Sequence, residues 1–180
     1  MPQYIAFLRG INVGGHRVKM DRLKELFEDL GFDDVWTLIA SGNVIFRAKS
    51  SKPEALTKKI ETLLNQSLGY DVPTILRTPE ELTRIVTSKP FTVAQMTLAT
   101  NDLYVILLTQ PAPRQAPEHL AAARTDDDEF FISDREVYWL RRKPISESKI
   151  SARVFLKALD QPGTSRNMTT LKKLNVALDR

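Results

Sequence analysis

The chain has 180 residues with a formal net charge of +4, and 42% of its residues are hydrophobic. This length can bury one sizeable core or two small ones, so one or two compact domains are expected. The chain contains no cysteine, which excludes disulfides, a thiolate nucleophile and every zinc site that uses cysteine.

The N-terminal segment does not read as a signal peptide. Its apolar run is interrupted by Arg9 and then by a polar loop, which leaves neither a hydrophobic core region nor a cleavage site. No apolar stretch approaches the roughly 20 residues that a membrane helix needs. We therefore expect a cytoplasmic protein without a membrane partner.

Residues 1–77 predict the order strand, helix, strand, strand, helix, strand. The strands are expected at 4–9, 35–40, 44–47 and 72–77, and the helices at 20–30 and 53–69. Turn chemistry at 41–43 predicts that the two middle strands form a hairpin. This order is the split βαβ arrangement of a ferredoxin-like unit.

Residues 78–180 repeat much of that order. A strand is expected at 103–108, a helix at 117–123, a hairpin from 130–132 and 137–140, and helices at 152–159 and 171–178. Asp134 and Arg135 form the expected hairpin turn. The sequence thus predicts an α+β fold of tandem ferredoxin-like (βαββαβ) halves, 1–77 and 78–180, with a degenerate second half and additional C-terminal helices.

Both faces of the first predicted sheet are apolar. A lone ferredoxin-like sheet carries helices on one face only, so its other face needs a cover, and the second half is the expected one. We therefore expect Phe7 or Trp36 to be largely buried.

The strongest candidate site is the loop at 9–17, which contributes Arg9, Asn12, Gly14, Gly15 and His16. Glycines let backbone amides approach a ligand, and a helix that begins after a strand favours anions. The spacing matches neither the dinucleotide fingerprint nor the Walker motif, so no particular cofactor is implied. The alternative is that Gly14 and Gly15 only make a tight turn.

Two other segments contribute candidate ligand-binding residues. Ser41 and Asn43 lie in the predicted hairpin turn, and Lys149, Arg166 and Asn167 lie near the C-terminus. Arg166 would clamp a phosphate or carboxylate, and we expect its guanidinium to approach the loop at 10–17. Plain turn chemistry and helix capping are the alternatives.

No metal site is predicted. The two histidines are far apart in the sequence, and the acidic run at 126–129 lacks the spacing and the glycine of a calcium loop.

Three segments resemble the uncharacterised bacterial family DUF1697: Leu-Arg-Gly-Ile-Asn-Val-Gly-Gly at 8–15, Ala-Ser-Gly-Asn-Val-Ile-Phe at 40–46, and Thr-Ser-Arg-Asn at 164–167. The third resembles a T-x-R-N-W motif, with Met168 in place of the tryptophan. The resemblance extends over nearly the whole chain. It implies a tandem ferredoxin-like architecture and brings no reaction with it.

Three functions remain open. The first is binding of a small anionic ligand (nucleotide, phosphate or carboxylate) in a pocket between the two halves. The second is nucleic-acid binding by residues 141–180, where ten Lys and Arg against three Asp and Glu give +7 and leave −3 for residues 1–140. The third is an interaction protein without ligand chemistry. Enzymatic activity, cofactor and oligomeric state stay undetermined.

Overall fold

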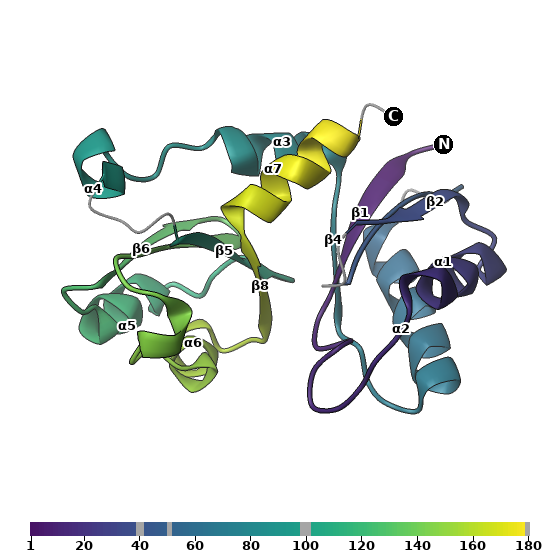
Figure 1. Ribbon diagram of the computed structural model, residues 1–180, viewed down its shortest axis with the longest axis horizontal. Coiled ribbons are helices and arrows are strands. Elements are labelled where there is room, and N and C mark those ends of the chain that lie inside the picture. The colour runs from purple at the N-terminus through teal and green to yellow at the C-terminus, as the bar shows by residue number, and fades with distance from the viewer. Residues whose placement is uncertain (39–41, 50–51, 98–101, 179–180) are drawn as a thin grey trace. The chain divides into compact units, whose positions relative to one another are not determined.

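The computed structural model describes residues 1–38, 42–49, 52–97 and 102–178. Within these residues the chain forms two four-stranded antiparallel sheets and seven α-helices (Figure 1). It divides into two compact units, Met1–Thr83 with Ala177–Arg180, and Arg84–Val176.

The first unit contains the predicted order of strands and helices. Its elements are β1 (Gln3–Leu8), α1 (Met20–Asp29), β2 (Asp33–Thr37), β3 (Asn43–Arg47), α2 (Pro53–Leu68) and β4 (Thr74–Arg77). The strand order is β2-β3-β1-β4. Strand β1 pairs with β3, where Tyr4 faces Phe46, and with β4, where Ala6 faces Leu76. The predicted pairing of the two middle strands is confirmed, because β2 pairs antiparallel with β3. Ser41, in the predicted turn, lies outside the described residues.

The core of the first unit lies between the sheet and its two helices. Leu23 and Phe27 of α1 and Ile60 of α2 are fully buried and belong to one apolar cluster with Ala6 and Phe46 of the sheet. Gly69 ends α2 in the left-handed conformation expected of a helix-terminating glycine.

The sheet face away from these helices is also closed to solvent along its central strands. Ile5, Phe7 and Ile45 alternate with the residues that face the helices, and their exposed fractions are at most 1%. The prediction for Phe7 is confirmed, whereas Trp36 is half-buried.

The second unit has the strand order β6-β7-β5-β8. Its strands are β5 (Asp102–Leu108), β6 (Asp128–Ser133), β7 (Glu136–Arg141) and β8 (Gly163–Asn167). The helices after β4 are α3 (Pro79–Thr87), α4 (Val93–Thr97), α5 (Ala116–Ala123), α6 (Ala152–Leu159) and α7 (Met168–Ala177), with a 3₁₀ turn at Ile145–Glu147. Helices α5 and α6 pack on one face of the sheet through Leu120 and Leu159, against Ile106 and Val137.

Strand β8 corrects the sequence prediction, which placed residues 164–170 in a loop before a helix that begins at residue 171. Residues Gly163–Asn167 instead pair antiparallel with β5, with Arg166 opposite Val105, and α7 begins at Met168. The strand escaped detection because Thr164 and Arg166, the residues it buries, are polar. Hydrophobic alternation therefore gives no signal there.

Candidate functional site

The connection from β1 to α1, residues 9–19, is the best candidate site in the first unit, and we call it the basic loop. It contains the predicted residues Arg9, Asn12, Gly14, Gly15 and His16. All of these are exposed except Asn12, which is half-buried. Figure 1 shows the loop at the end of the sheet where β1 stops.

The base of the basic loop is held in a fixed conformation. The side-chain oxygen of Asn12 accepts a hydrogen bond of 2.7 Å from the amide of Val18. The Tyr70 hydroxyl donates to the carbonyl of Ile11 at 2.9 Å, and the Ile11 side chain is buried. Asn12 therefore shapes the loop, a role that the sequence did not distinguish from ligand binding.

Glycine is required at the exposed part of the loop for conformational reasons. Gly10, Gly14 and Gly15 have φ angles of +70°, +68° and +91°, a region that other residues enter only at a cost. A Cβ atom at any of the three would meet nothing within 4 Å. These positions are therefore open to solvent, and a ligand could approach the backbone there.

Gly42, in the predicted hairpin turn, packs against residues at the start of the basic loop. The Gly42 carbonyl accepts a hydrogen bond of 2.8 Å from the amide of Leu8. A Cβ at Gly42 would lie 2.7 Å from Cγ2 of Ile11, which is too close for any side chain. Asn43 is fully buried, and its amide group donates to the carbonyl of Leu38 at 3.1 Å. The motif at 8–15 and the described residues 42–46 of the second motif thus meet at one end of the sheet, where Asn43 has a structural contact.

The electrostatics of the basic loop are one-sided. No acidic residue precedes Asp21 in the sequence. Within the described residues, the side chains of Arg9, Arg17 and Lys19 make no hydrogen bond or ion pair. Helix α1 follows directly, and no side chain caps its first amides. Cations without an ion pair beside a helix start attract anions, and Asp21 is the acidic residue in the first turn of α1.

An aromatic pair flanks these cations. The ring of His16 stacks on Tyr70, with the ring centroids 3.8 Å apart and the planes 20° from parallel. His16 is exposed, whereas Tyr70 is half-buried. The pair therefore presents a flat aromatic surface at the rim of the basic loop.

In the second unit, Arg166 and Asn167 lie in β8 and have local partners. The Arg166 guanidinium donates to the Thr164 hydroxyl at 2.8 Å and to the Ser165 carbonyl at 2.9 Å. Burial lowers the pKa of Arg166 to about 10, so the group stays protonated at neutral pH. The Asn167 side chain accepts a hydrogen bond of 2.8 Å from the amide of Thr169, at the start of α7. The approach of Arg166 to the basic loop stays a prediction.

Lys149, the remaining candidate, lies elsewhere in the second unit. It lines a polar cavity of about 220 Å³ together with residues from the turn before β6 and from the end of β7. The sequence indicated a charged residue near a chain reversal, but the cavity depends on the hairpin register and could not be read from residue types.

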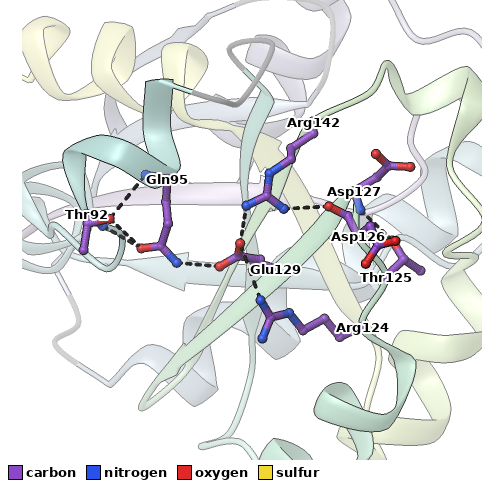
Figure 2. A network of polar contacts seen from close by, with 8 residues as sticks. All are labelled: Thr92, Gln95, Arg124, Thr125, Asp126, Asp127, Glu129 and Arg142. Carbon is purple, nitrogen blue, oxygen red and sulfur yellow. Dashed lines mark hydrogen bonds and ion pairs between the residues drawn. The ribbon is translucent and has the colours of Figure 1, made fainter.

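A network of polar contacts around Glu129 connects α4 to the β6–β7 hairpin (Figure 2). Glu129 accepts hydrogen bonds from Gln95 at 2.5 Å and from Arg142, and Arg124 lies 3.6 Å away. The Arg142 guanidinium also donates to the Asp126 carbonyl at 2.8 Å. The bond from Arg142 is the main reason that the pKa of Glu129 lies below its usual value, against the opposing effect of burial.

This network explains the basic residues that begin the C-terminal segment. Arg141 lies opposite Asp128 in the hairpin and is buried, and Lys143 pairs with Asp127 at 2.8 Å. Asp127, Asp128 and Glu129 of the acidic run are therefore paired with the basic run at 141–143. A two-residue turn at 134–135, predicted from the sequence, already places the acidic run opposite the basic run across the hairpin.

Among the described residues, the His, Asp and Glu side chains form no group of three or more that could hold a metal ion. None of the described helices is long and apolar enough to cross a membrane.

The two antiparallel sheets and their helices define an α+β protein. The family model described as "Protein of unknown function (DUF1697)" matches residues 1–138. The chain therefore belongs to the DUF1697 family. The segment at 164–167 lies beyond the matched range.

One solved structure shares the fold along the whole chain. The conserved bacterial protein SP0830 from Streptococcus pneumoniae is 23% identical with a TM-score of 0.76, and the alignment covers 100% of this chain and 99% of that one. No curated protein matches the chain.

Proposed function

We propose that the basic loop binds a small anionic ligand, of the class of nucleotides, phosphates and carboxylates. The observation that carries this proposal is the set of three exposed cations, Arg9, Arg17 and Lys19, that have no partner among the described residues. Such cations beside exposed glycine amides and an uncapped helix start are the elements of a phosphate site.

Within this class a nucleotide is favoured over a bare phosphate. The stacked rings of His16 and Tyr70 leave the outer face of His16 exposed. A planar base could stack there while its phosphate meets Arg9 and the amides of Gly14 and Gly15, and stacking on an aromatic side chain contributes about 1–3 kcal/mol per base. Asn12 and Asn43 would then act by holding the loop and turn in place.

We also infer that each unit is a ferredoxin-like βαββαβ module. The strand order β2-β3-β1-β4 supports this inference, and β6-β7-β5-β8 repeats it position by position. The absence of cysteine supports a reducing compartment such as the cytoplasm.

Titration calorimetry with adenosine monophosphate, inorganic phosphate and acetate at near-physiological salt tests the binding proposal. We expect adenosine monophosphate to bind most tightly, and Arg9→Gln to weaken it by tenfold or more, about 1.4 kcal/mol. Lys58→Gln is the matched control, because Lys58 is an exposed cation on α2 of the same unit and has no ion pair among the described residues.

Two outcomes would contradict the proposal. One is that none of the three ligands binds at millimolar concentration. The other is that Lys58→Gln weakens binding as much as Arg9→Gln, which would reduce the effect to net charge. If an oligonucleotide binds where the mononucleotide does not, the nucleic-acid alternative replaces the small ligand.

A further inference from the structure

The polar cavity of the second unit forms where the β6–β7 hairpin meets the segment after β7, and we call it the hairpin pocket. Its volume is about 220 Å³, and its lining residues are Thr125, Asp126, Asp127, Asp128, Arg141, Lys143, Glu147, Ser148 and Lys149. The volume lies below the range of roughly 300–1,000 Å³ that is typical of drug-sized ligands. The hairpin pocket therefore fits one small molecule.

A buried ion pair forms the inner wall of the hairpin pocket. Arg141 is 1% exposed and lies over the Trp139 ring at 4.7 Å. Its Nε atom is 3.8 Å from the Asp128 carboxylate. That carboxylate also accepts hydrogen bonds of 2.7 Å from the Trp139 indole and from the Thr125 hydroxyl. These contacts fix charged groups of both signs beside the cavity, in a polar environment that is held rigid.

In the outer part of the hairpin pocket, several charged side chains of both signs have no ion pair within the described residues. Lys143 pairs with Asp127 at 2.8 Å. The charged groups of Asp126, Glu147 and Lys149 make no hydrogen bond or ion pair within the described part of the chain. Two carboxylates and one ammonium group therefore have no hydrogen bond or ion pair and are open to a ligand, while the charge of Lys143 acts on both carboxylates.

We propose that the hairpin pocket binds a small zwitterion of the α-amino-acid class. Lys149 takes the ligand carboxylate, and Asp126 with Glu147 takes the ligand ammonium group. Each charge of such a ligand then meets the opposite charge, whereas a simple anion or cation would satisfy one sign and be repelled by the other. The geometry does not favour a metal ion, because the described acidic residues form no group of three that could hold one.

This site is independent of the basic loop, since its residues all belong to the second unit. The two proposals therefore succeed or fail separately. A variant of the basic loop serves as a control for the hairpin pocket.

Two tryptophans make the test direct, because the chain contains only Trp36 and Trp139. The Trp139 indole N–H bonds to a carboxylate of the hairpin pocket, so its ¹H–¹⁵N resonance reports on occupancy. The Trp36 resonance, from the first unit, is the internal reference. The probes are glycine, L-serine and L-lysine, with acetate and methylammonium as single-charge controls.

We expect at least one of the amino acids to shift the Trp139 indole resonance saturably, with a dissociation constant at least tenfold below those of acetate and methylammonium. Lys149→Gln and Glu147→Gln should each raise that constant at least tenfold. Arg153→Gln, an exposed cation on α6, and Arg9→Gln should leave it unchanged. An unchanged Trp139 resonance in the ligand-free variants of the second unit will show that this unit is folded, and an unchanged Trp36 resonance will show the same for the first unit.

The proposal is overturned if no amino acid shifts the Trp139 resonance at about 10 mM, near the weak end of useful affinities. Binding of acetate as tight as that of the amino acids would also overturn it, since the pocket would then be a simple anion site. Unaltered binding in both Lys149→Gln and Glu147→Gln would do the same.

Discussion

Gly42 is the residue on which the candidate site of the first unit most depends. Its φ angle is +74°, and a Cβ atom there would lie 2.7 Å from Ile11 Cγ2 and 3.1 Å from Leu8 Cβ. Two separate costs would therefore follow from any side chain at this position. One is the left-handed backbone, and the other is a collision with the residues that support the basic loop.

We predict that Gly42→Ala lowers the free energy of unfolding by about 2–5 kcal/mol, from about 1–2 for the backbone and about 1–3 for overpacking. Gly69→Ala separates these contributions. Gly69 has a similar φ angle of +81° but open space around the added Cβ, so only the backbone cost of about 1–2 kcal/mol applies. Urea denaturation of both variants measures the difference. Equal losses would show that the collision with Ile11 is relieved cheaply.

Residue types in the sequence identified the members of this region but not their separate roles. Asn12 and Asn43 are typical of turns, and both were predicted as ligand-binding candidates. Asn43 is fully buried with a bond to Leu38, and Asn12 bonds to Val18. These bonds join residues five or six positions apart, so the local pattern alone does not show where each amide points.

Among the elements, the β6–β7 hairpin carries most of the polar organisation of the second unit. Its two-residue turn aligns Asp128 with Arg141 and Ser133 with Glu136. The turn was predictable from Asp134 and Arg135, and the alternation of apolar residues indicated both strands. Strand β8 was not predictable in this way. It pairs with β5 through main-chain hydrogen bonds, and the side chains that it buries are polar, so no alternation of apolar residues marks it.

Glu129 gives the hairpin a pH-dependent contribution to stability. Its pKa in the folded protein is lowered, first by the bond from Arg142, so the stabilisation is present at pH values above the unfolded pKa. It is lost as the pH falls through the lowered value in the folded state. We predict that Glu129→Gln costs about 1.5–3 kcal/mol at pH 7, the range for a hydrogen bond to a charged group.

The difference in melting temperature between wild type and Glu129→Gln should therefore narrow as the pH is lowered from 7 to below the usual glutamate pKa of 4.5. Glu118→Gln is the control, because Glu118 is an exposed carboxylate on α5 of the same unit. A difference that stays constant with pH would show that Glu129 acts through packing and not through its charge.

At the scale of the whole molecule, part of the positive charge of residues 141–180 is buried or paired with carboxylates. Arg141 and Arg166 are buried, and Arg142 and Lys143 are paired with carboxylates. Among the described residues, the exposed cations without an ion pair are Lys149 before α6, Arg153 and Lys157 of α6, and Lys172 and Lys173 of α7.

We therefore predict weak retention on single-stranded RNA, lost by about 0.15 M salt, because few cations remain to displace counterions from the phosphates. Retention is measured on immobilised RNA over a salt gradient, with Lys172→Gln/Lys173→Gln as the variant that removes one exposed pair. Tight binding above that salt concentration, abolished in this double variant, would instead establish α7 as a nucleic-acid contact.

The matching strand orders of the two units raise a question of descent. In the second unit the connection equivalent to the basic loop is residues 109–115, between β5 and α5. It contains no glycine, its two prolines carry no amide hydrogen, and the amides of Gln110 and Ala112 are already bonded to Gln161 and Asp134. If one ancestral module was duplicated, the loop of the first copy has kept backbone amides that can donate to a ligand. In the second copy these amides are missing or bonded within the protein. The second copy is then free to acquire a different specificity.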